Sequence, residues 1–392
     1  MSKISRILVL DGNERSALAI TRCLGQHGLH PIVGAETDAS LAGASRFCSN
    51  QVRYTSPYQA PLAFVDDLQR IVTEYAIEFI LPATDVTSLL AARHQEKWPN
   101  AKLPIARYEQ LDLLSNKYAL FKLAKAEGVP IPETHYIDNE AQALDLADTL
   151  TYPAVLKPFR SRILREDDWL VTSVRVASDA IAYRQLIASH PEYQAYPFLV
   201  QQFIPGKGTG YFVLYDHDEL ISDFCHLRLR EKPPSGGVSV LCESSPVDAQ
   251  LREYSQRIFR HTGWHGVAMV EFKVGDDGIP YLMEINTRFW GSLQLAIDAG
   301  LEFPYMLYQM TIGEKLHPPP YKQGIRLRWL LGDLDRLYIV LKSTDYSLDN
   351  KFQQALSFLN FFSTNTHYEI NRLRDIKPFF YELRKYIREI VS

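Results

Sequence analysis

Residues 267–291 constrain the fold of this chain more than any other segment. Two apolar, strand-like runs flank Gly275-Asp-Asp-Gly278, a sequence typical of a hairpin turn. With these four residues as the loop, Glu284 is a diagonal neighbour of Glu271 on one face of the hairpin, and Asn286 follows two residues later. A register shifted by one residue would instead place the two carboxylates on opposite faces.

These three side chains form a set that suits a hard divalent cation. Two carboxylates flanked by apolar residues, here Val270 and Met283, repel each other unless a cation lies between them. Carboxylate and amide oxygens suit Mg²⁺, which completes its shell with phosphates and water. The alternative is a pair of surface glutamates balanced by lysines. The apolar flanks and the nearby Asn286 and Arg288 favour the metal site.

Two lysines are placed to share the charge of phosphates held by such a metal. Lys157 ends the predicted strand 153–157 and is followed by Pro158, so it projects from a rigid element. Lys117 lies in the first turn of a predicted helix, 116–127, where a cation is unfavourable to the helix dipole unless an anion is close. Taken alone, either lysine is also consistent with a solvated surface residue.

The run 200–206 offers a place for a planar ring. It is largely apolar, contains Gln201, Phe203 and Ile204, and ends in a turn at Pro205-Gly206. The backbone groups of its last residues could hydrogen-bond an adenine held between apolar walls. The same run is equally consistent with a plain edge strand.

The first third of the chain alternates strands and helices. A strand-like run at 7–10 precedes a helical pattern that stops at Gly28, and strands follow at 31–34 and, after another helical pattern, at 79–81. This order predicts a parallel sheet. The turn after residue 10 lacks the glycine fingerprint GxGxxG, so we do not assign a dinucleotide to this sheet.

Asp11 and Asp85 each follow one of these strands. Ligands gather at the carboxyl ends of parallel strands, so both carboxylates are candidate substrate contacts. The alternative is that they cap the helices that follow.

The rest of the chain divides at Pro318-Pro319-Pro320. Mixed strands and helices precede these prolines, with one helix expected at 293–312, and a helical pattern runs from residue 333. We predict an α/β domain with a parallel sheet, an α+β domain and a helical C-terminal extension, over residues 1–112, 113–317 and 318–392.

Composition excludes several classes of protein. The 42 basic and 46 acidic residues give a net charge of −4, which argues against a general nucleic-acid binder. No stretch approaches the roughly 20 apolar residues of a membrane span, and the apolar run near the N-terminus is too short for a signal peptide. The four cysteines are far apart and form no CxxC pair, which favours a reducing compartment. We therefore expect a cytoplasmic protein without nucleic-acid or membrane partners.

Together these residues resemble the ATP-grasp ligases of the carbamoyl-phosphate-synthase-like type. The resemblance covers 115–313 well and 5–112 more loosely, as the α/β domain that precedes the ATP-grasp domain in that family. Its markers are Asn116-Lys117, Ala154-Val-Leu-Lys-Pro158, Val200-Gln-Gln-Phe-Ile-Pro-Gly206, and Val270-Glu-Phe272 paired with Met283-Glu-Ile-Asn-Thr-Arg288.

The resemblance implies a role for each matching residue. In that family two lysines contact the ATP phosphates, the residues after the hinge glutamine hold adenine, and two glutamates with an asparagine bind Mg²⁺, for which Mn²⁺ can substitute. The following arginine touches phosphate or the acyl phosphate. The roles fall here on the lysines Lys117 and Lys157, the hinge residues Gln201, Phe203 and Ile204, the metal ligands Glu271, Glu284 and Asn286, and Arg288, with Lys157 and Arg288 as the catalytic pair.

Three positions depart from the family pattern. The loop 159–165 carries three arginines but no glycine, although the family usually covers the phosphates with a glycine-rich loop. Gly208 stands where a ribose-binding glutamate is usual, and Thr287 replaces the usual proline between Asn286 and Arg288.

The substrate side is expected on the strand 222–230. Strict alternation would place His226, Arg228 and Arg230 on one face, where they could form a wall for a substrate carboxylate or the γ-phosphate. The alternative is a solvated edge strand. Asp11 and Asp85 are the expected contacts of an amine.

The expected reaction is ATP-dependent activation of a small-molecule carboxylate as an acyl phosphate, which an amine attacks to give an amide, ADP and phosphate. A homodimer is compatible with the sequence. A non-catalytic ATP-binding regulator of the same fold is the main alternative, favoured by the missing glycine loop. A kinase or a carbamoyl-phosphate-type enzyme differs only in the acceptor.

Overall fold

The computed structural model describes residues 5–165, 168–361 and 364–391. Its N-terminal part contains the predicted parallel sheet, in the order β3-β2-β1-β4. Apolar residues of β1 enter two hydrophobic clusters, Ile7 and Val9 on one side and Leu8 on the other, which explains the continuous apolar run. The elements are β1 (Arg6–Val9), α1 (Arg15–Gln26), β2 (His30–Ala35), β3 (Asn50–Arg53), α2 (Pro61–Glu74), β4 (Phe79–Leu81), α3 (Asp85–Arg93) and η1 (Gln95–Lys97).

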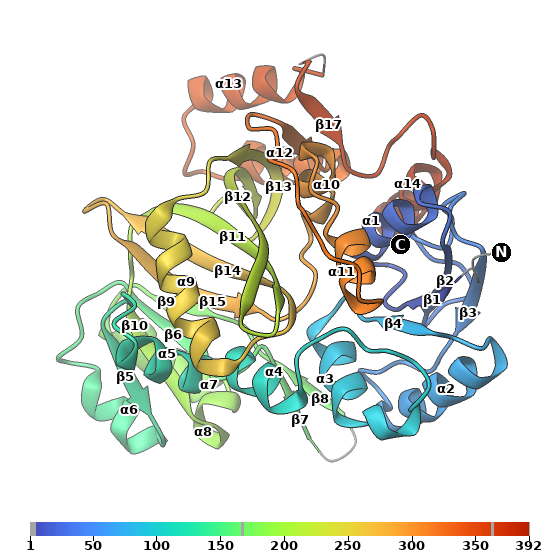
Figure 1. Cartoon of the computed structure of the whole chain (residues 1–392). Coiled ribbons are helices and arrows are strands. Elements are labelled where there is room, and N and C mark those ends of the chain that lie inside the picture. The colour runs from blue at the N-terminus through green and yellow to red at the C-terminus, as the bar shows by residue number, and fades with distance from the viewer. Residues whose placement is uncertain (1–4, 166–167, 362–363, 392) are drawn as a thin grey trace.

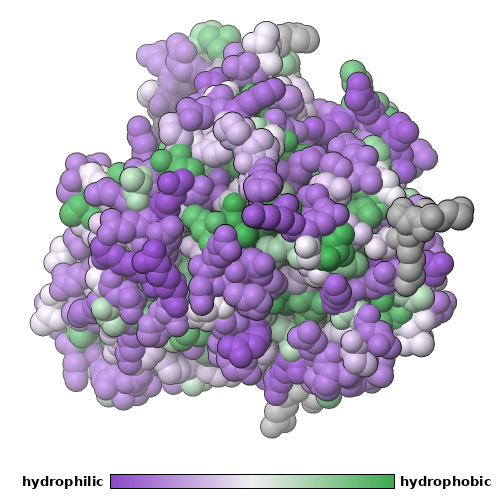
Figure 2. Space-filling view, in the orientation of Figure 1, coloured by the Kyte–Doolittle hydropathy of each residue, from purple (hydrophilic) through white to green (hydrophobic). Residues whose placement is uncertain are grey.

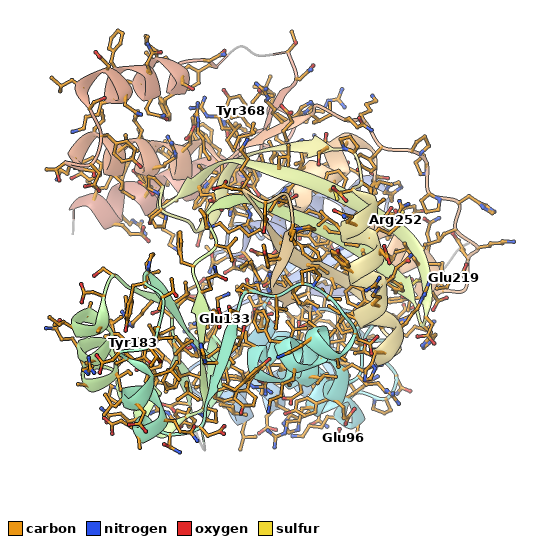
Figure 3. All side chains as sticks on the ribbon, turned by 90° about the vertical axis from the view of Figure 1, so that its left-hand side faces the viewer. Glu96, Glu133, Tyr183, Glu219, Arg252 and Tyr368 are labelled. Atoms are coloured by element: carbon orange, nitrogen blue, oxygen red, sulfur yellow. The ribbon has the colours of Figure 1, made fainter. Side chains whose placement is uncertain are left out.

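A second, antiparallel sheet has the order β5-β10-β6-β9 (Figure 1). Helices pack against it, and Tyr183 on one of them and Glu133 before β5 mark this part of the molecule in Figure 3. Asn116 caps α5, since its side chain accepts a hydrogen bond from the backbone N–H of Ala119. The elements are α4 (Tyr108–Ser115), α5 (Lys117–Ala126), β5 (Thr134–Ile137), α6 (Glu140–Leu146), β6 (Ala154–Pro158), β7 (Arg162–Leu164), β8 (Trp169–Val171), β9 (Arg175–Ala177), α7 (Ala180–Ser189), α8 (Glu192–Ala195) and β10 (Phe198–Gln202).

The largest sheet has seven strands in the order β15-β14-β11-β12-β13-β16-β17. All neighbours in it are antiparallel except β16 and β17. The elements are β11 (Gly206–Asp216), β12 (Glu219–Lys232), β13 (Val238–Ser245), α9 (Ala249–Thr262), β14 (Gly266–Gly275), β15 (Pro280–Asn286), α10 (Leu293–Ala299), α11 (Phe303–Thr311), β16 (Arg326–Arg328), α12 (Leu330–Lys342), α13 (Leu348–Phe358), β17 (Thr366–Tyr368) and α14 (Lys377–Val391).

The single helix expected at 293–312 is wrong. Gly300 ends α10 with a φ of 105°, a conformation that a glycine adopts without strain. Pro304 then lies in the first turn of α11, where its missing N–H costs no helical hydrogen bond. The apolar periodicity continues across the break, which is why the pattern resembled one helix.

The hairpin between β14 and β15 departs from the predicted register. Glu271 pairs directly with Glu284 instead of lying diagonal to it. A β-bulge at this point leaves Met283 without a partner in the ladder, and Val274 pairs with Pro280, so the turn is also longer than four residues. The two shifts leave both carboxylates on one face, as predicted.

The C-terminal segment contains strands as well as helices. β16 and β17 follow the prolines at 318–320 and still extend the large sheet through β13. The last helix, α14, returns to the N-terminal part (Figure 1), where its Tyr381 hydroxyl donates to Asn13 Oδ1 and to the Ala39 carbonyl. The face shown in Figure 2 is mostly hydrophilic, with small separate hydrophobic patches. Among the residues described, no helix combines the length and the apolar character that crossing a bilayer requires.

Candidate active site

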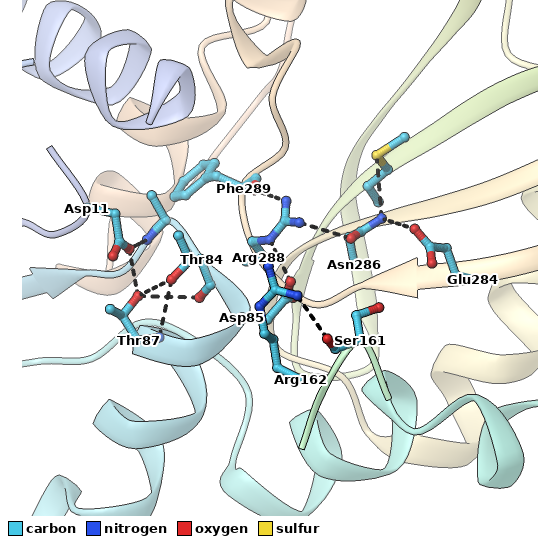
Figure 4. A network of polar contacts seen from close by, with 12 residues as sticks. Asp11, Thr84, Asp85, Thr87, Ser161, Arg162, Glu284, Asn286, Arg288 and Phe289 are labelled. Carbon is cyan, nitrogen blue, oxygen red and sulfur yellow. Dashed lines mark hydrogen bonds and ion pairs between the residues drawn. The ribbon is translucent and has the colours of Figure 1, made fainter. Parts of the chain in front are cut away.

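The carboxylates of Glu271 and Glu284 converge on one point. The amide Nδ2 of Asn286 donates to Oε1 of Glu271 at 3.1 Å and to Oε1 of Glu284 at 3.3 Å (Figure 4 shows the second contact). All three side chains come from β14 and β15, two adjacent strands at the edge of the large sheet. The bulge places the two glutamates opposite each other, so the convergence follows directly from the backbone.

Each carboxylate already has one cationic partner. Lys117 Nζ lies 3.1 Å from Glu284 Oε2, and Arg228 Nη2 lies 2.6 Å from Glu271 Oε2. Burial raises the pKa of Glu271 although Arg228 opposes that shift. Burial would also raise the pKa of Glu284, but the ammonium groups of Lys117 and Lys157 outweigh it and bring this pKa to about 2.

Lys157 is buried and forms no ion pair with a carboxylate of the residues that the structure describes. Its Nζ lies 3.8 Å from Met283 Sδ and 5.4 Å from the centre of the Phe121 ring. Burial and the neighbouring Lys117 lower its pKa to about 8. The carboxylates of Glu284 and Glu271 act in the opposite direction but do not outweigh burial, so a further anion would stabilise this ammonium.

The donor set fits a divalent cation. Two carboxylate oxygens already lie within hydrogen-bond distance of one amide nitrogen, so a single cation at that point would reach both. Rotating the amide of Asn286 by half a turn would direct Oδ1 toward the same point. Three oxygen ligands from rigid strands leave the remaining positions to phosphates and water, the coordination that Mg²⁺ adopts in proteins.

Arg288 connects this set to the N-terminal sheet. Its Nη2 donates to Oδ1 of Asn286 at 3.1 Å and its Nε to Oδ2 of Asp85 at 3.2 Å (Figure 4). Asp85 lies in the first turn of α3, whose N-cap is Thr84. Asp85 therefore faces the carboxylates of the large sheet, as expected of a residue at the carboxyl end of a parallel strand.

The side chain of Asp11 does not face this space. Asp11 is therefore neither the expected substrate contact nor a cap of the helix that follows it. Its Oδ2 accepts hydrogen bonds from the Thr87 hydroxyl at 2.6 Å and the Ala83 N–H at 2.9 Å (Figure 4). It therefore connects β1 to the start of α3 and does not cap α1, whose N-cap is Glu14. Burial raises its pKa to about 6. The sequence places Asp11 at the correct edge of the sheet but does not show which way the side chain turns.

Two adjoining cavities meet at these residues. One, of about 410 Å³, includes Lys117 and Asp85 in its lining, and the other, of about 420 Å³, includes Arg228 and Trp290. Both are lined by Arg15, Glu284, Asn286 and Arg288. Glu14, Arg15 and Tyr58 line the first cavity although they were not predicted as site residues, and Arg160 and Arg162 from the loop without glycine line it too. The sequence signal that could have identified residues 14 and 15 as site residues is their position just beyond the first strand.

The hinge segment lies inside the smaller antiparallel sheet. β10 has β5 on one side and β6 on the other, so the edge-strand alternative is wrong. Gln201 is buried, and its Nε2 donates to Thr134 Oγ1 at 2.9 Å. Beyond the end of β10, the N–H groups of Phe203 and Ile204 have no backbone hydrogen bond to any residue within the described ranges. These two groups are thus available to a ligand.

The alternation predicted for 222–230 is wrong beyond Arg228. Register shifts in β12 on both sides of Arg230 turn its side chain to Asp333, at 2.6 Å, away from Glu271. His226 is 1% exposed, and burial lowers its pKa to about 3, so it is neutral and gives an anion no charge. Only Arg228 of the three reaches the paired glutamates. β12 lies between β11 and β13, so it is not an edge strand either.

The chain is similar to a protein family and to several known proteins. A family described as "ATP-grasp in the biosynthetic pathway with Ter operon" matches residues 195–332, which include Glu271, Glu284, Asn286 and Arg288. The chain is 27% identical over 212 residues to the vancomycin B-type resistance protein VanB of Enterococcus faecalis, and 28% identical over 195 residues to a D-alanine–D-alanine ligase of Synechococcus sp.. The chain is an ATP-grasp superfamily protein.

The relatives of this ATP-grasp protein are distant. The two alignments cover 49% and 47% of this chain and only 59% and 56% of the relatives, so the chain spans less than three fifths of the length of either one. The biotin carboxylase domain of Hydrogenobacter thermophilus 2-oxoglutarate carboxylase, solved with MgADP, superposes with a TM-score of 0.65 at 14% identity, covering 83% of this chain and 74% of that one. An L-amino acid ligase of Bacillus licheniformis gives 0.61 at 16%, covering 80% and 75%. At these identities the structures support the fold alone.

The loop without glycine forms the hairpin of β7 and β8 in this ATP-grasp protein. Arg160 and Arg162 line the cavity next to Lys117. The hairpin is attached to the N-terminal part, because the indole N–H of the buried Trp169 donates to the Pro57 carbonyl at 2.9 Å. Arginines thus occupy the place where the family pattern has a glycine loop.

Proposed function

We propose that this protein is an ATP-dependent ligase that joins a small-molecule carboxylate to an amine with the help of Mg²⁺. The observation that carries the proposal is the convergence of Glu271, Glu284 and Asn286 beside two buried lysines. Membership of the ATP-grasp ligase superfamily supports it, because its members are typically carboxylate–amine ligases.

In this proposal the triphosphate lies between the two lysines and the paired glutamates. Lys117 and Lys157 would contact its phosphates, while Glu271, Glu284 and Asn286 would hold Mg²⁺ or Mn²⁺. The adenine would lie against Phe203 and Ile204, whose N–H groups lack backbone partners among the residues described. When bound, the metal would neutralise charge on the transferring phosphoryl group.

The chain supplies positioning and charge and no covalent nucleophile. The carboxylate oxygen takes the γ-phosphoryl group and ADP leaves. The amine nitrogen then attacks the acyl carbon, the bond from that carbon to the phosphate oxygen breaks, and the amide, phosphate and a proton are released. Arg288 would stabilise the oxygens that carry negative charge in both steps. Arg228, next to Glu271, is the proposed contact of the substrate carboxylate.

A non-catalytic ATP-binding regulator is the second candidate, because the phosphate loop lacks glycine. Two observations oppose it. Arg160 and Arg162 bring positive charge to the cavity, and the three proposed metal ligands, Glu271, Glu284 and Asn286, converge on one point. The two candidates differ in turnover, since a regulator would bind ATP without substrate-dependent hydrolysis.

ADP release with Mg²⁺ and a pool of amino acids tests the proposal. Amino acids are the first choice because two of the similar proteins are, by their names, ligases of amino acids. We expect substrate-dependent ADP release that Glu284→Gln lowers at least 100-fold, because the metal loses a charged ligand.

Glu219→Gln is the matched control. Glu219 is exposed at the turn between β11 and β12, at the edge of the molecule in Figure 3, and this variant should keep wild-type activity. Full activity in Glu284→Gln would refute the assigned site. ATP binding without turnover on any pool would favour the regulator.

A further inference from the structure

A third cavity, of about 310 Å³, lies between the N-terminal sheet and the C-terminal helix. Its lining includes Glu14 and Arg15 from the segment after β1, Trp329 before α12, and Tyr381 and Glu382 from α14. Glu14 and Arg15 also line the cavity that contains Lys117 and Arg288. The third cavity therefore shares part of its wall with the cavity of the proposed reaction centre.

Contacts between distant segments hold the walls of this cavity. The Tyr381 hydroxyl lies 3.0 Å from Asn13 Oδ1 and 2.9 Å from the Ala39 carbonyl. The Trp329 indole N–H donates to Glu382 Oε1 at 2.7 Å, and the Arg15 guanidinium lies 4.1 Å from the Trp329 ring centre. The cavity is thus formed before any ligand enters it, as ligand sites usually are.

The charges that line the cavity leave two carboxylates without a cation. Lys232 pairs with Asp335, Lys385 lies 4.0 Å from Glu389, and Arg15 pairs with Glu369, which lies outside the lining. Two acidic side chains remain. The carboxylate of Glu14 has no hydrogen bond or ion pair in the part of the chain that is described, and that of Glu382 has only the Trp329 indole.

The pKa of Glu382 is consistent with a carboxylate that lacks an ion-pair partner among the described residues. Burial raises its pKa to about 7, the indole hydrogen bond opposes the shift, and the negative charge of Glu369 adds to it. Arg15 and Asp335 also face this carboxyl group, the first lowering and the second raising its pKa. An ammonium group bound next to this half-buried carboxyl group would stabilise its ionised form.

We infer that this cavity binds the amine substrate, as a primary ammonium of amino-acid size held by Glu14 and Glu382 with its side chain against Trp329 and Tyr381. The inference rests on the proposed ligase function. It replaces the two amine contacts expected from the sequence, Asp11, which is turned away, and Asp85, which pairs with Arg288. Because Glu14 borders both cavities, an amine bound there lies next to the space where the acyl phosphate would form.

Amino-acid amides test the inference directly, because their blocked carboxyl group leaves them only the role of amine. We expect L-tyrosinamide to bind the full chain in calorimetric titration, and Glu14→Gln and Glu382→Gln each to weaken it about tenfold, the loss expected of one charge-assisted hydrogen bond. N-acetyl-L-tyrosinamide, which lacks the positive charge, should bind at least tenfold more weakly to the wild type.

Mg-ATP binding serves as the control for folding, and Glu219→Gln as the matched surface variant. Both glutamine variants should retain Mg-ATP binding, and Glu219→Gln should bind L-tyrosinamide as the wild type does. No binding of L-tyrosinamide to the wild type would overturn the inference. Equal binding by both glutamine variants would overturn it too.

Hydroxylamine separates this inference from the proposed function. It is small enough to attack an acyl phosphate without an amine subsite, and the product is a hydroxamate. We expect Glu382→Gln to lower amide formation with L-tyrosinamide about tenfold more than hydroxamate formation, and an equal loss of both would contradict the subsite. Absence of hydroxamate in the wild type with every carboxylate tested would count against the ligase function itself, whereas the binding experiment would still decide whether the cavity takes an amine.

Discussion

At the scale of single residues, some charged side chains of the site have an ion-pair partner in the described part of the chain and others have none. Glu271 and Glu284 each have a cation in contact, Arg228 and Lys117 respectively. Lys157 has no ion-pair partner within residues 5–165, 168–361 and 364–391, although it is buried to the same degree as Lys117. The carboxylates of Glu284 and Glu271 offset the burial of Lys157 only in part. In the proposed complex, the phosphates of the nucleotide would stabilise this ammonium further.

Asp11 gives a prediction about stability and pH. Its pKa is raised from 3.8 to about 6 in the folded chain, so the folded state binds the proton more tightly than the unfolded state. The corresponding stabilisation is present below about pH 4 and is lost as pH rises through about 6. Asp11→Asn removes this titration, so the difference in unfolding free energy, wild type minus variant, should fall by on the order of 3 kcal/mol from pH 4 to pH 7.

Thermal unfolding of both proteins at pH 4, 5, 6 and 7 measures that difference. Asp349→Asn, at an exposed position on α13, is the control and should show no such trend. A constant difference between wild type and Asp11→Asn across the range would show that Asp11 has the same pKa folded and unfolded.

At the scale of elements, the hairpin of β7 and β8 offers a matched pair of arginines. Arg162 lines the cavity beside Lys117, whereas Arg165 pairs with Asp168 within the hairpin and is exposed. We expect Arg162→Gln to raise the KM for ATP about tenfold, because a charge-assisted contact to phosphate is lost. Arg165→Gln should leave the KM within twofold of wild type. Equal effects of the two substitutions would mean that the hairpin contributes only general positive charge.

The sequence predicts elements better than it predicts how strands register. The alternating and helical patterns of β14, β15 and α5 are local, so the existence of these elements could be read directly. The bulge beside Glu271 depends on how two strands pair, and no local pattern shows it. Glu271 and Glu284 still lie on one face as predicted, because the two one-residue shifts add up to two residues. In β12 the two shifts flank Arg230 itself, and this residue turns away from the site.

At the scale of the whole molecule, the C-terminal segment is tied to the first domain. The Arg22 guanidinium donates to Asp375 Oδ2 and to the carbonyls of Glu369 and Ile370, each at 2.8 Å, inside the protein. Asp375 also accepts from the Ser45 hydroxyl at 2.7 Å. These partners lie more than 300 residues apart in sequence, so no pattern in the chain predicts them. The C-terminal segment thus closes back on the N-terminal part of the chain, where Glu14 is the N-cap of α1.

Asp375→Ala tests whether this tie matters for ligand binding as well as for stability. The substitution leaves Arg22 buried without its counter-ion, a change that typically costs 3–5 kcal/mol. We expect the midpoint of thermal unfolding to fall by roughly 5 °C, while Asp349→Ala on the surface changes it little. Because α14 carries Glu382 and Tyr381, the affinity for L-tyrosinamide should fall more than the affinity for Mg-ATP, whose proposed ligands lie on β14, β15, α5 and β6. An equal fall in both affinities would mean that Asp375 supports the whole fold and not the amine cavity in particular.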